Sequence, residues 1–162
     1  MTRARATSRG AVRVGVISDT HGSLPDRALA ALEGVDAIVH AGDVGGGQVL
    51  DLLRSIAPVT AVRGNMDHSG EASQLDGVAN VSLGGVRFLV GHKKGELVAA
   101  VDPGPAGVRV VVTGHSHRAH VEESEGILYV NPGSAGSDRG NGLSMGVVEI
   151  EDGDVRVRIV EL

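Results

Sequence analysis

Seven side chains that could bind a metal stand at or just past the ends of short apolar runs. They comprise two carboxylates, one amide and four imidazoles, and their order along the chain is Asp19, His21, Asp43, Asn65, His92, His115 and His117. In open α/β sheets, ligands gather outside the carboxyl ends of the strands. We therefore expect these residues, which are far apart in the sequence, to meet in one crevice.

The chemistry of this set is that of a metal site. Carboxylate, amide and imidazole donors together suit Mn, Fe, Ni or Zn better than Ca or Mg. Seven protein ligands are too many for one ion, so we expect two divalent ions that share a bridging Asp and a hydroxide. Two such ions carry more positive charge than two carboxylates neutralise, and the surplus would attract a phosphate. The shared hydroxide would be a nucleophile near neutral pH.

Strand-like and helix-like segments alternate over the first 65 residues. Apolar, β-branched runs predict strands at 12–18, 36–40 and 59–63, and helical spacing of apolar residues predicts helices at 25–32 and 49–56. This alternation indicates right-handed βαβ units and a largely parallel sheet. Further strands are expected at 78–83, 86–90, 108–113, 119–123, 127–130, 145–150 and 155–160. The simplest architecture is two packed sheets with helices outside.

Length and composition exclude several classes of protein. The 162 residues, 41% hydrophobic and 22% charged, predict a single folded domain at 11–162 behind a disordered, Arg-rich tail at 1–10. The net charge of -5 and the near absence of aromatic residues argue against stable nucleic-acid binding. No apolar run reaches the ~20 residues that cross a membrane. The lack of cysteine excludes thiolate metal sites and favours a cytoplasmic location.

Five motifs in a fixed order resemble the calcineurin-like metallophosphoesterase superfamily. They are Asp19-x-His21, Gly42-Asp43, Gly64-Asn65, His92 and Gly114-His115-Ser116-His117. The small size and the Asn131-Pro132-Gly133-Ser134 segment resemble the small, cap-less YfcE-like phosphodiesterases of this superfamily. The resemblance implies an α/β fold, a four-layer αββα sandwich in which two mixed β-sheets are flanked by helices. It also implies assembly into a homo-oligomer.

The resemblance further implies how the ligands are shared between the two ions. One ion would be held by Asp19, His21, Asp43 and His117, and the other by Asp43, Asn65, His92 and His115. Asp43 would bridge them, and Asp43, Asn65 and His92 would be the catalytic residues. Mn is the favoured metal, with Ni, Fe and Zn as alternatives.

The chain departs from the superfamily pattern around these ligands. Many members follow the Asn ligand with a His that protonates the leaving group, but Met66 stands there. His68 is expected to be exposed, yet it is close enough in sequence to replace the missing acid. Lys93 and Lys94 follow the fourth motif and either add positive charge at the rim or are simply solvated. Arg139, together with Asn65, is a candidate for orienting the phosphate.

These features predict a metal-dependent phosphodiesterase in which a metal-bridging hydroxide attacks phosphorus in line. A phosphate ester would be its substrate. Two alternatives stay open: a phosphomonoesterase, and a non-catalytic metal-binding scaffold like the retromer subunit that resembles this family. His40, which precedes Asp43 on a predicted strand, is expected to support the site through hydrogen bonds and not to bind metal.

Overall fold

The computed structural model describes residues 10–162, so the predicted tail at 1–10 lies outside the described residues except for Gly10. One five-stranded sheet has the order β10-β9-β1-β2-β3. Its strands are β1 (Val12–Ile17), β2 (Ala37–His40), β3 (Val59–Ala61), β9 (Ser144–Glu151) and β10 (Asp154–Glu161). Strands β1, β2 and β3 are parallel, as the alternating pattern predicted, and β9 runs antiparallel to both β1 and β10. The parallel crossovers contain the helices α2 (Asp26–Ala31) and α3 (Gly47–Arg54).

The second five-stranded sheet has the order β4-β5-β6-β8-β7. Its strands are β4 (Val78–Leu83), β5 (Val86–Gly91), β6 (Val110–Val112), β7 (Ala119–Ser124) and β8 (Ile127–Pro132). The three central strands are parallel, and β4 and β7 are antiparallel to their neighbours. Both sheets are therefore mixed.

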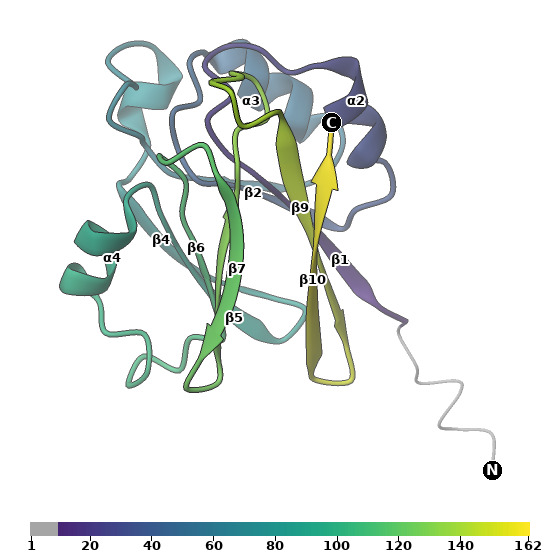
Figure 1. Cartoon of the computed structure of the whole chain (residues 1–162), viewed down its shortest axis with the longest axis vertical. Helices are drawn as coiled ribbons and strands as arrows, with labels where there is room; N and C mark the ends of the chain where they lie inside the picture. The colour runs from purple at the N-terminus through teal and green to yellow at the C-terminus, as the bar shows by residue number, and fades with distance from the viewer. Residues whose placement is uncertain (1–9) are drawn as a thin grey trace.

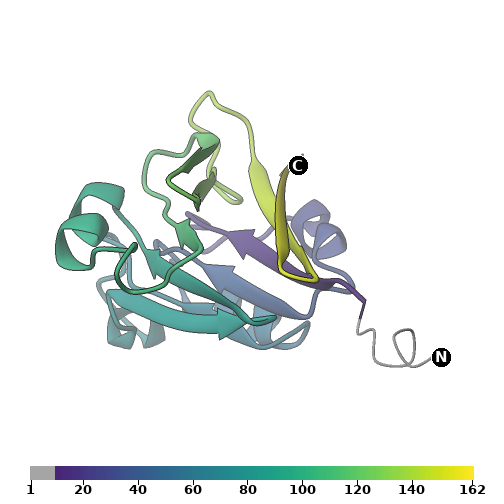
Figure 2. The same ribbon diagram turned by 90° about the horizontal axis from the view of Figure 1, so that it is seen from below.

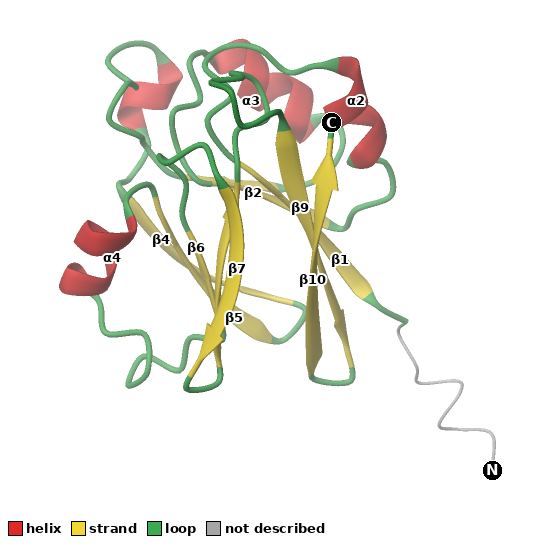
Figure 3. Cartoon of the chain, viewed as in Figure 1, coloured by secondary structure: helices red, strands yellow, loops and turns green. Residues whose placement is uncertain are grey.

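The two sheets pack face to face, with helices on both outer faces (Figures 1 and 2). Because side chains alternate along a strand, Val14 and Val16 of β1 point into a buried core shared with Phe88 and Val90 of β5. A second core joins the other face of the first sheet to α2 and α3, and a third joins the outer face of the second sheet to α4 (Lys94–Ala100). Figure 3 shows the layers by element type. The predicted αββα sandwich is confirmed.

The structure adds two short helices that the sequence pattern did not indicate. These are α4 and the 3-10 helix η1 (Glu71–Gln74). Only Leu97 of α4 is buried, so the helix has too narrow an apolar face to produce a clear periodicity. Strand β3 also ends two residues earlier than expected, because the Arg63 N–H turns away to bond the carbonyl of Asp76. Within residues 10–162, no helix is both long and apolar enough to cross a membrane.

Candidate metal centre

Five loops at the carboxyl ends of β1, β2, β3, β5 and β6 are tied together by backbone hydrogen bonds. The N–H groups of Asp19 and His21 donate to the carbonyls of Gly42 and Asp43, both at 3.0 Å, so the β1 loop runs along the β2 loop. The Gly114 N–H donates to the His92 carbonyl at 2.9 Å and joins the β6 loop to the β5 loop. The side chains predicted to bind metal are thereby presented at one edge of both sheets.

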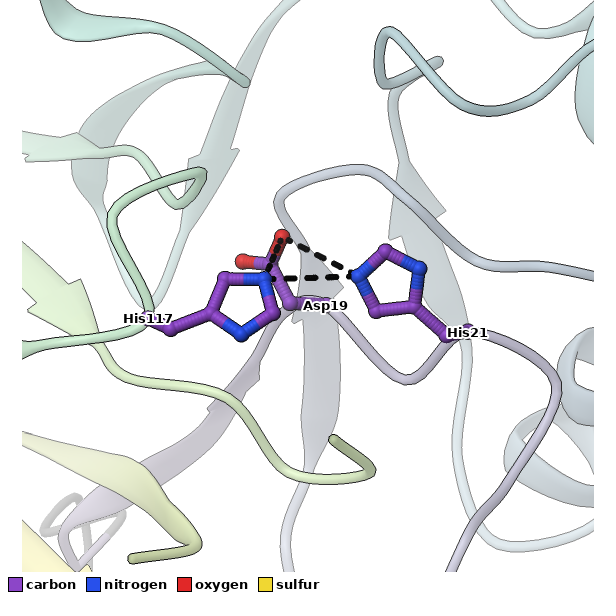
Figure 4. Close-up of side chains that lie close together, drawn as sticks. All are labelled: Asp19, His21 and His117. Carbon is purple, nitrogen blue, oxygen red and sulfur yellow. Dashed lines mark hydrogen bonds and ion pairs between the residues drawn. The ribbon is translucent and has the colours of Figure 1, made fainter. Parts of the chain in front are cut away.

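Asp19 lies at the centre of this cluster and is fully buried. Its Oδ2 accepts hydrogen bonds from the Ser18 hydroxyl at 2.7 Å and from the His115 N–H at 3.0 Å. Its Oδ1 is buried and has no hydrogen-bond partner. That atom lies 3.3 Å from His117 Nε2 and 3.8 Å from His21 Nε2, and Figure 4 shows both rings directed at it. A buried carboxylate oxygen without a donor is costly, so this position is suited to a cation.

Asp43 lies beside Asp19, and here too one carboxylate oxygen accepts a hydrogen bond while the other faces histidine rings. Oδ1 accepts the Met66 N–H at 2.8 Å, and Oδ2 lies 3.3 Å from His92 Nε2 and 3.7 Å from His21 Nε2. Burial by itself raises the pKa of Asp43, but the nearby His92 ring and the hydrogen bond from the Met66 backbone outweigh it and lower the pKa to about 2. The Asp43 carboxylate is therefore ionised and available to a metal at neutral pH.

Two histidines are oriented by backbone carbonyls. Nδ1 of His92 lies 2.7 Å from the Ala41 carbonyl, and Nδ1 of His117 lies 3.3 Å from the Ser137 carbonyl. Since a carbonyl only accepts, each Nδ1 carries the proton, and in the neutral ring Nε2 then has a free lone pair facing the carboxylates. Burial lowers the pKa of His92, but the Asp43 and Asp19 carboxylates beside Nε2 and the hydrogen bond from Nδ1 to the Ala41 carbonyl raise the pKa overall. A proton therefore competes with a metal for His92 Nε2.

The donor atoms form two overlapping groups, Asp19-His21-His117 and Asp19-Asp43-His92, in each of which all atoms lie within 4.8 Å of one another. Besides Asp19 Oδ1, Nε2 of His92 is buried and has no hydrogen-bond partner. Asp19 Oδ1 is anionic and His92 Nε2 carries a lone pair, and both lack a hydrogen-bond partner. Such a pair of neighbouring atoms is suited to binding divalent cations. Five of the seven predicted ligands therefore converge as expected.

His115 and Asn65 lie at the margin of the two groups, and both are exposed. The ring of His115 packs edge-on against that of His92, with centroids 5.2 Å apart. Asn65 and His92 line a cavity of about 390 Å³, which we call the first hollow. Their coordination of metal stays a prediction.

The remaining candidates lie at the surface. Met66 is 54% exposed, and His68 and Arg139 are exposed as well. Within residues 10–162, Arg139 makes no ion pair or side-chain hydrogen bond with the cluster. Its neighbour Asp138 accepts the N–H groups of Gly140 and Gly142 and closes the turn that carries Arg139. A role of Arg139 in phosphate binding stays a prediction.

Backbone strain is concentrated at this site. Among residues 10–162, seven non-glycine residues have a left-handed backbone, and five of them are predicted ligands: Asp19, His21, Asp43, His115 and His117. The other two, Glu125 and Asp152, each precede glycine in a strand-to-strand turn, where this conformation is common. Such strain persists where the surrounding structure imposes it, and it gathers at functional sites.

Gly114 has a steric role in the same region. A Cβ at this position would lie 2.0 Å from Ser18 Oγ and 2.6 Å from Asp19 Oδ2. The close approach of the β6 loop to Asp19 therefore requires glycine.

Asp67 is a supporting residue that sequence reasoning missed. It is buried, and its carboxylate accepts the N–H groups of Gly64 at 2.8 Å, Gly45 at 3.0 Å and Val44 at 3.2 Å. It thereby fastens the β3 loop to the residues that follow Asp43. No spacing rule distinguishes such a carboxylate from a solvated one, although its place two residues after Asn65 was a weak signal.

The Asn-Pro-Gly-Ser segment supports the site through the side chains of Asn131 and Ser134. The Ser134 hydroxyl donates to the Asp19 carbonyl at 2.7 Å. The Asn131 amide donates to the Gly114 carbonyl at 3.0 Å and to the Ser116 hydroxyl at 3.0 Å. The segment therefore braces the loops that carry Asp19 and His115.

His40 supports the site, as the sequence predicted, and its proton positions follow from its partners. The Gly42 N–H donates to Nδ1 at 3.1 Å, and the Thr20 hydroxyl lies 3.0 Å from Nε2. Because that hydroxyl gives its one proton to the Val44 carbonyl at 2.7 Å, Nε2 must be the donor to Thr20. Burial lowers the pKa of His40 from 6.5 to about 4, so the ring is neutral.

Comparison with known proteins agrees with this geometry. The family model of the calcineurin-like phosphoesterase superfamily domain matches residues 12–153. A probable metallophosphoesterase of Methanocaldococcus jannaschii is 33% identical over 132 residues, which cover 77% of this chain and 69% of the relative. A phosphodiesterase of the same organism is 26% identical over 168 residues, covering 93% of this chain and all of the relative (100%). The chain belongs to the calcineurin-like phosphoesterase superfamily.

Among solved structures, vacuolar protein sorting 29 of Cryptosporidium parvum superposes with a TM-score of 0.75 at 20% identity. The superposition covers 94% of this chain and 98% of that one. At this identity the likeness establishes the shared fold alone. The relatives named as metallophosphoesterase and phosphodiesterase support a hydrolase of phosphate esters.

Proposed function

We propose that this protein is a phosphodiesterase that depends on two divalent metal ions. The observation that carries the proposal is the buried, unpartnered Oδ1 of Asp19, surrounded by the Nε2 atoms of His21, His92 and His117. In a protein without metal this atom would be an uncompensated anionic acceptor. With divalent ions bound it becomes a ligand.

Asp19, His21, Asp43 and His117 would hold one ion, and Asp43, Asn65, His92 and His115 the other. The metal pair would supply a hydroxide nucleophile for in-line attack and neutralise charge on the phosphate. Asp43 suits the shared position, because its Oδ2 lies between His21 and His92, which belong to different ions. Backbone carbonyls hold His92 and His117 with Nε2 toward the centre, so these rings need no reorientation on binding.

The substrate phosphate would lie over Asn65 and His92, at the inner end of the first hollow. Exposed Met66 offers no proton to a leaving group, so cleavage would favour esters whose leaving group departs as a stable anion. This favours diester substrates with acidic leaving groups in an assay. The phosphodiesterase relative, which matches along its whole length, supports the same choice.

The test compares bis(p-nitrophenyl) phosphate with p-nitrophenyl phosphate after metal removal and addition of Mn, Ni, Fe or Zn in turn. We expect metal-dependent hydrolysis, highest with Mn, with the diester as the better substrate. Asp19→Asn should reduce kcat/KM by at least about 100-fold, since it removes the central anionic ligand. Asp154→Asn, which changes an exposed carboxylate at the start of β10, is the matched control and should behave as wild type. Full activity without metal, or in Asp19→Asn, would overturn the proposal.

The same measurements separate two alternatives. A preference for the monoester would make the protein a phosphomonoesterase. The fold likeness to vacuolar protein sorting 29 favours a scaffold as the second candidate, which would bind metal without hydrolysing either ester. The five donors that converge support the enzyme. A cytoplasmic location and assembly into a homo-oligomer stay predictions.

A further inference from the structure

A second cavity, of about 590 Å³, opens beside the metal centre and is called the second hollow here. It lies between the start of α4 and the ends of β6, β7 and β8. The residues that matter for its chemistry are Lys93, His115, Ser116, Arg118, His120 and Tyr129. Because His115 is a predicted ligand, one end of the hollow touches the centre. Its size is in the range of pockets for small organic ligands.

The lining of the second hollow is basic. Among the described residues that line it, there is no Asp or Glu, whereas Glu96 lines the first hollow. Lys93 and Arg118 take part in no ion pair within residues 10–162. Lys94, by contrast, is paired with Glu122 at 3.0 Å. Two cations without an ion-pair partner therefore line a cavity that no carboxylate lines, while the nearby Glu122 is paired with Lys94, and this favours an anionic ligand.

The hollow also contains the one tyrosine of the chain. Tyr129 is half-buried on β8, and the one phenylalanine, Phe88, is completely buried in the core. The Lys94 ammonium lies 4.6 Å from the centroid of the Tyr129 ring and fixes it by a cation–π contact. A fixed aromatic ring beside two unpaired cations suits an organic group that carries a phosphate.

We propose that the second hollow binds one substituent of the phosphodiester substrate, and that this substituent carries a phosphate of its own. The inference rests on the proposed function, since it places the scissile phosphate at the metal centre. Arg118 is the specificity-determining residue, because a guanidinium binds phosphate through two parallel hydrogen bonds. Lys93 lines both hollows and adds positive charge at the boundary between them.

The test measures binding by calorimetry to the Mn-loaded protein, with thymidine 5′-phosphate and thymidine 3′,5′-bisphosphate as probes. The two differ by a single phosphate. We expect the bisphosphate to bind about tenfold more tightly, as one charge-assisted contact implies. In Arg118→Ala the ratio of the two Kd values should fall to about two or less. In Arg118→Lys the ratio should be restored to most of its wild-type value, because the positive charge is kept. Arg156→Ala, which removes an exposed arginine on β10, should keep the wild-type ratio.

Equal binding of both probes to wild type, no measurable binding of the bisphosphate, or an unchanged ratio in Arg118→Ala would overturn the inference. Hydrolysis distinguishes it from the proposed function. The substrates are thymidine 5′-(p-nitrophenyl phosphate) with and without a 3′-phosphate. If neither is cleaved while the Arg118-dependent binding ratio holds, the phosphodiesterase proposal fails and the subsite stands. If both are cleaved with equal kcat/KM and the binding ratio is one, the subsite fails and the enzyme stands.

Discussion

Replacing Asp67 with Asn should loosen the metal centre although Asp67 contacts no metal donor atom in the structure. Its carboxylate accepts three backbone N–H groups, two on Oδ2 and one on Oδ1. Asparagine can keep an oxygen toward Gly64 and Val44, but its amide nitrogen then faces the Gly45 N–H, donor against donor. Gly45 would lose its attachment to the β3 loop, and Val44 and Gly64 would keep theirs through a neutral oxygen only.

The size of the effect follows from these bonds. A hydrogen bond to a charged group contributes about 1.5–3 kcal/mol, and an unpaired buried donor costs about 1–3 kcal/mol. Asp67→Asn removes one bond and the charge that strengthens the other two, so we expect the free energy of unfolding to fall by about 2 kcal/mol. Asp67→Ala removes all three and should cost about 4 kcal/mol, since such terms are not fully additive.

Urea denaturation in EDTA measures this loss without the contribution of bound metal, and titration with Mn measures metal affinity. We expect the affinity of Asp67→Asn to fall about tenfold, as for other residues that orient ligands. The control is Asp138→Asn, whose carboxylate also accepts two backbone N–H groups but is exposed to water. If Asp67→Asn matches this control in both stability and affinity, the three hydrogen bonds do not hold the loops as argued.

Three further predictions concern the centre and its surroundings. Asp43→Ala should abolish tight binding of both ions, because Oδ2 lies between His21 and His92, and elemental analysis that finds one full equivalent would refute a shared position. Removal of metal should lower stability by about 3 kcal/mol for each ion bound at 100 times its Kd, and thermal melts that coincide with and without Mn would contradict this. The pKa of His40 is about 4 folded and 6.5 unfolded, so the unfolded state binds more protons between these values and stability is lost as pH falls through that range. From pH 7 to 5 the loss should be about 2 kcal/mol. Urea midpoints should show this loss of stability in wild type but not in His40→Asn, which keeps an acceptor for the Gly42 N–H. Equal pH profiles of the two proteins would contradict the role of His40.

The sequence predicted the framework of the centre because its signals were local. A β-branched run that ends in Asp19-Thr20-His21 identifies both a strand and the residues at its tip, without knowledge of the rest of the fold. Ligands gather at the carboxyl ends of strands, and this rule predicts that Asp19 and His117 meet. In the structure, Asp19 Oδ1 lies 3.3 Å from His117 Nε2. Residue type and the end of a strand were sufficient to bring together five of the seven predicted ligands.

The supporting residues could not be predicted because their partners are backbone atoms far away in sequence. Ser134 donates to the carbonyl of Asp19, 115 positions earlier, and no pattern in either segment indicates that bond. The three N–H groups that bind Asp67 belong to two different loops, whose relative placement depends on the parallel pairing of β2 and β3. The second hollow could not be predicted either, because α4, which borders it, has one buried residue and therefore shows no helical periodicity in the sequence.

The supporting hydrogen bonds hold residues of the site in a strained backbone conformation. A non-glycine residue in a left-handed conformation costs about 1 kcal/mol or more, so five of them consume much of the 5–15 kcal/mol that stabilises a typical domain. Three of these residues are held through their backbone groups: the Asp19 N–H donates to the Gly42 carbonyl, the Ser134 hydroxyl donates to the Asp19 carbonyl, and the His21 N–H donates to the Asp43 carbonyl. Because these bonds involve backbone atoms and Ser134, and no predicted ligand side chain, they fix the backbone of the loops from which the predicted ligands project. We therefore expect metal affinity to depend on the loop framework as well as on the predicted donor side chains, and substitutions such as Asp67→Asn should affect it without changing a predicted ligand.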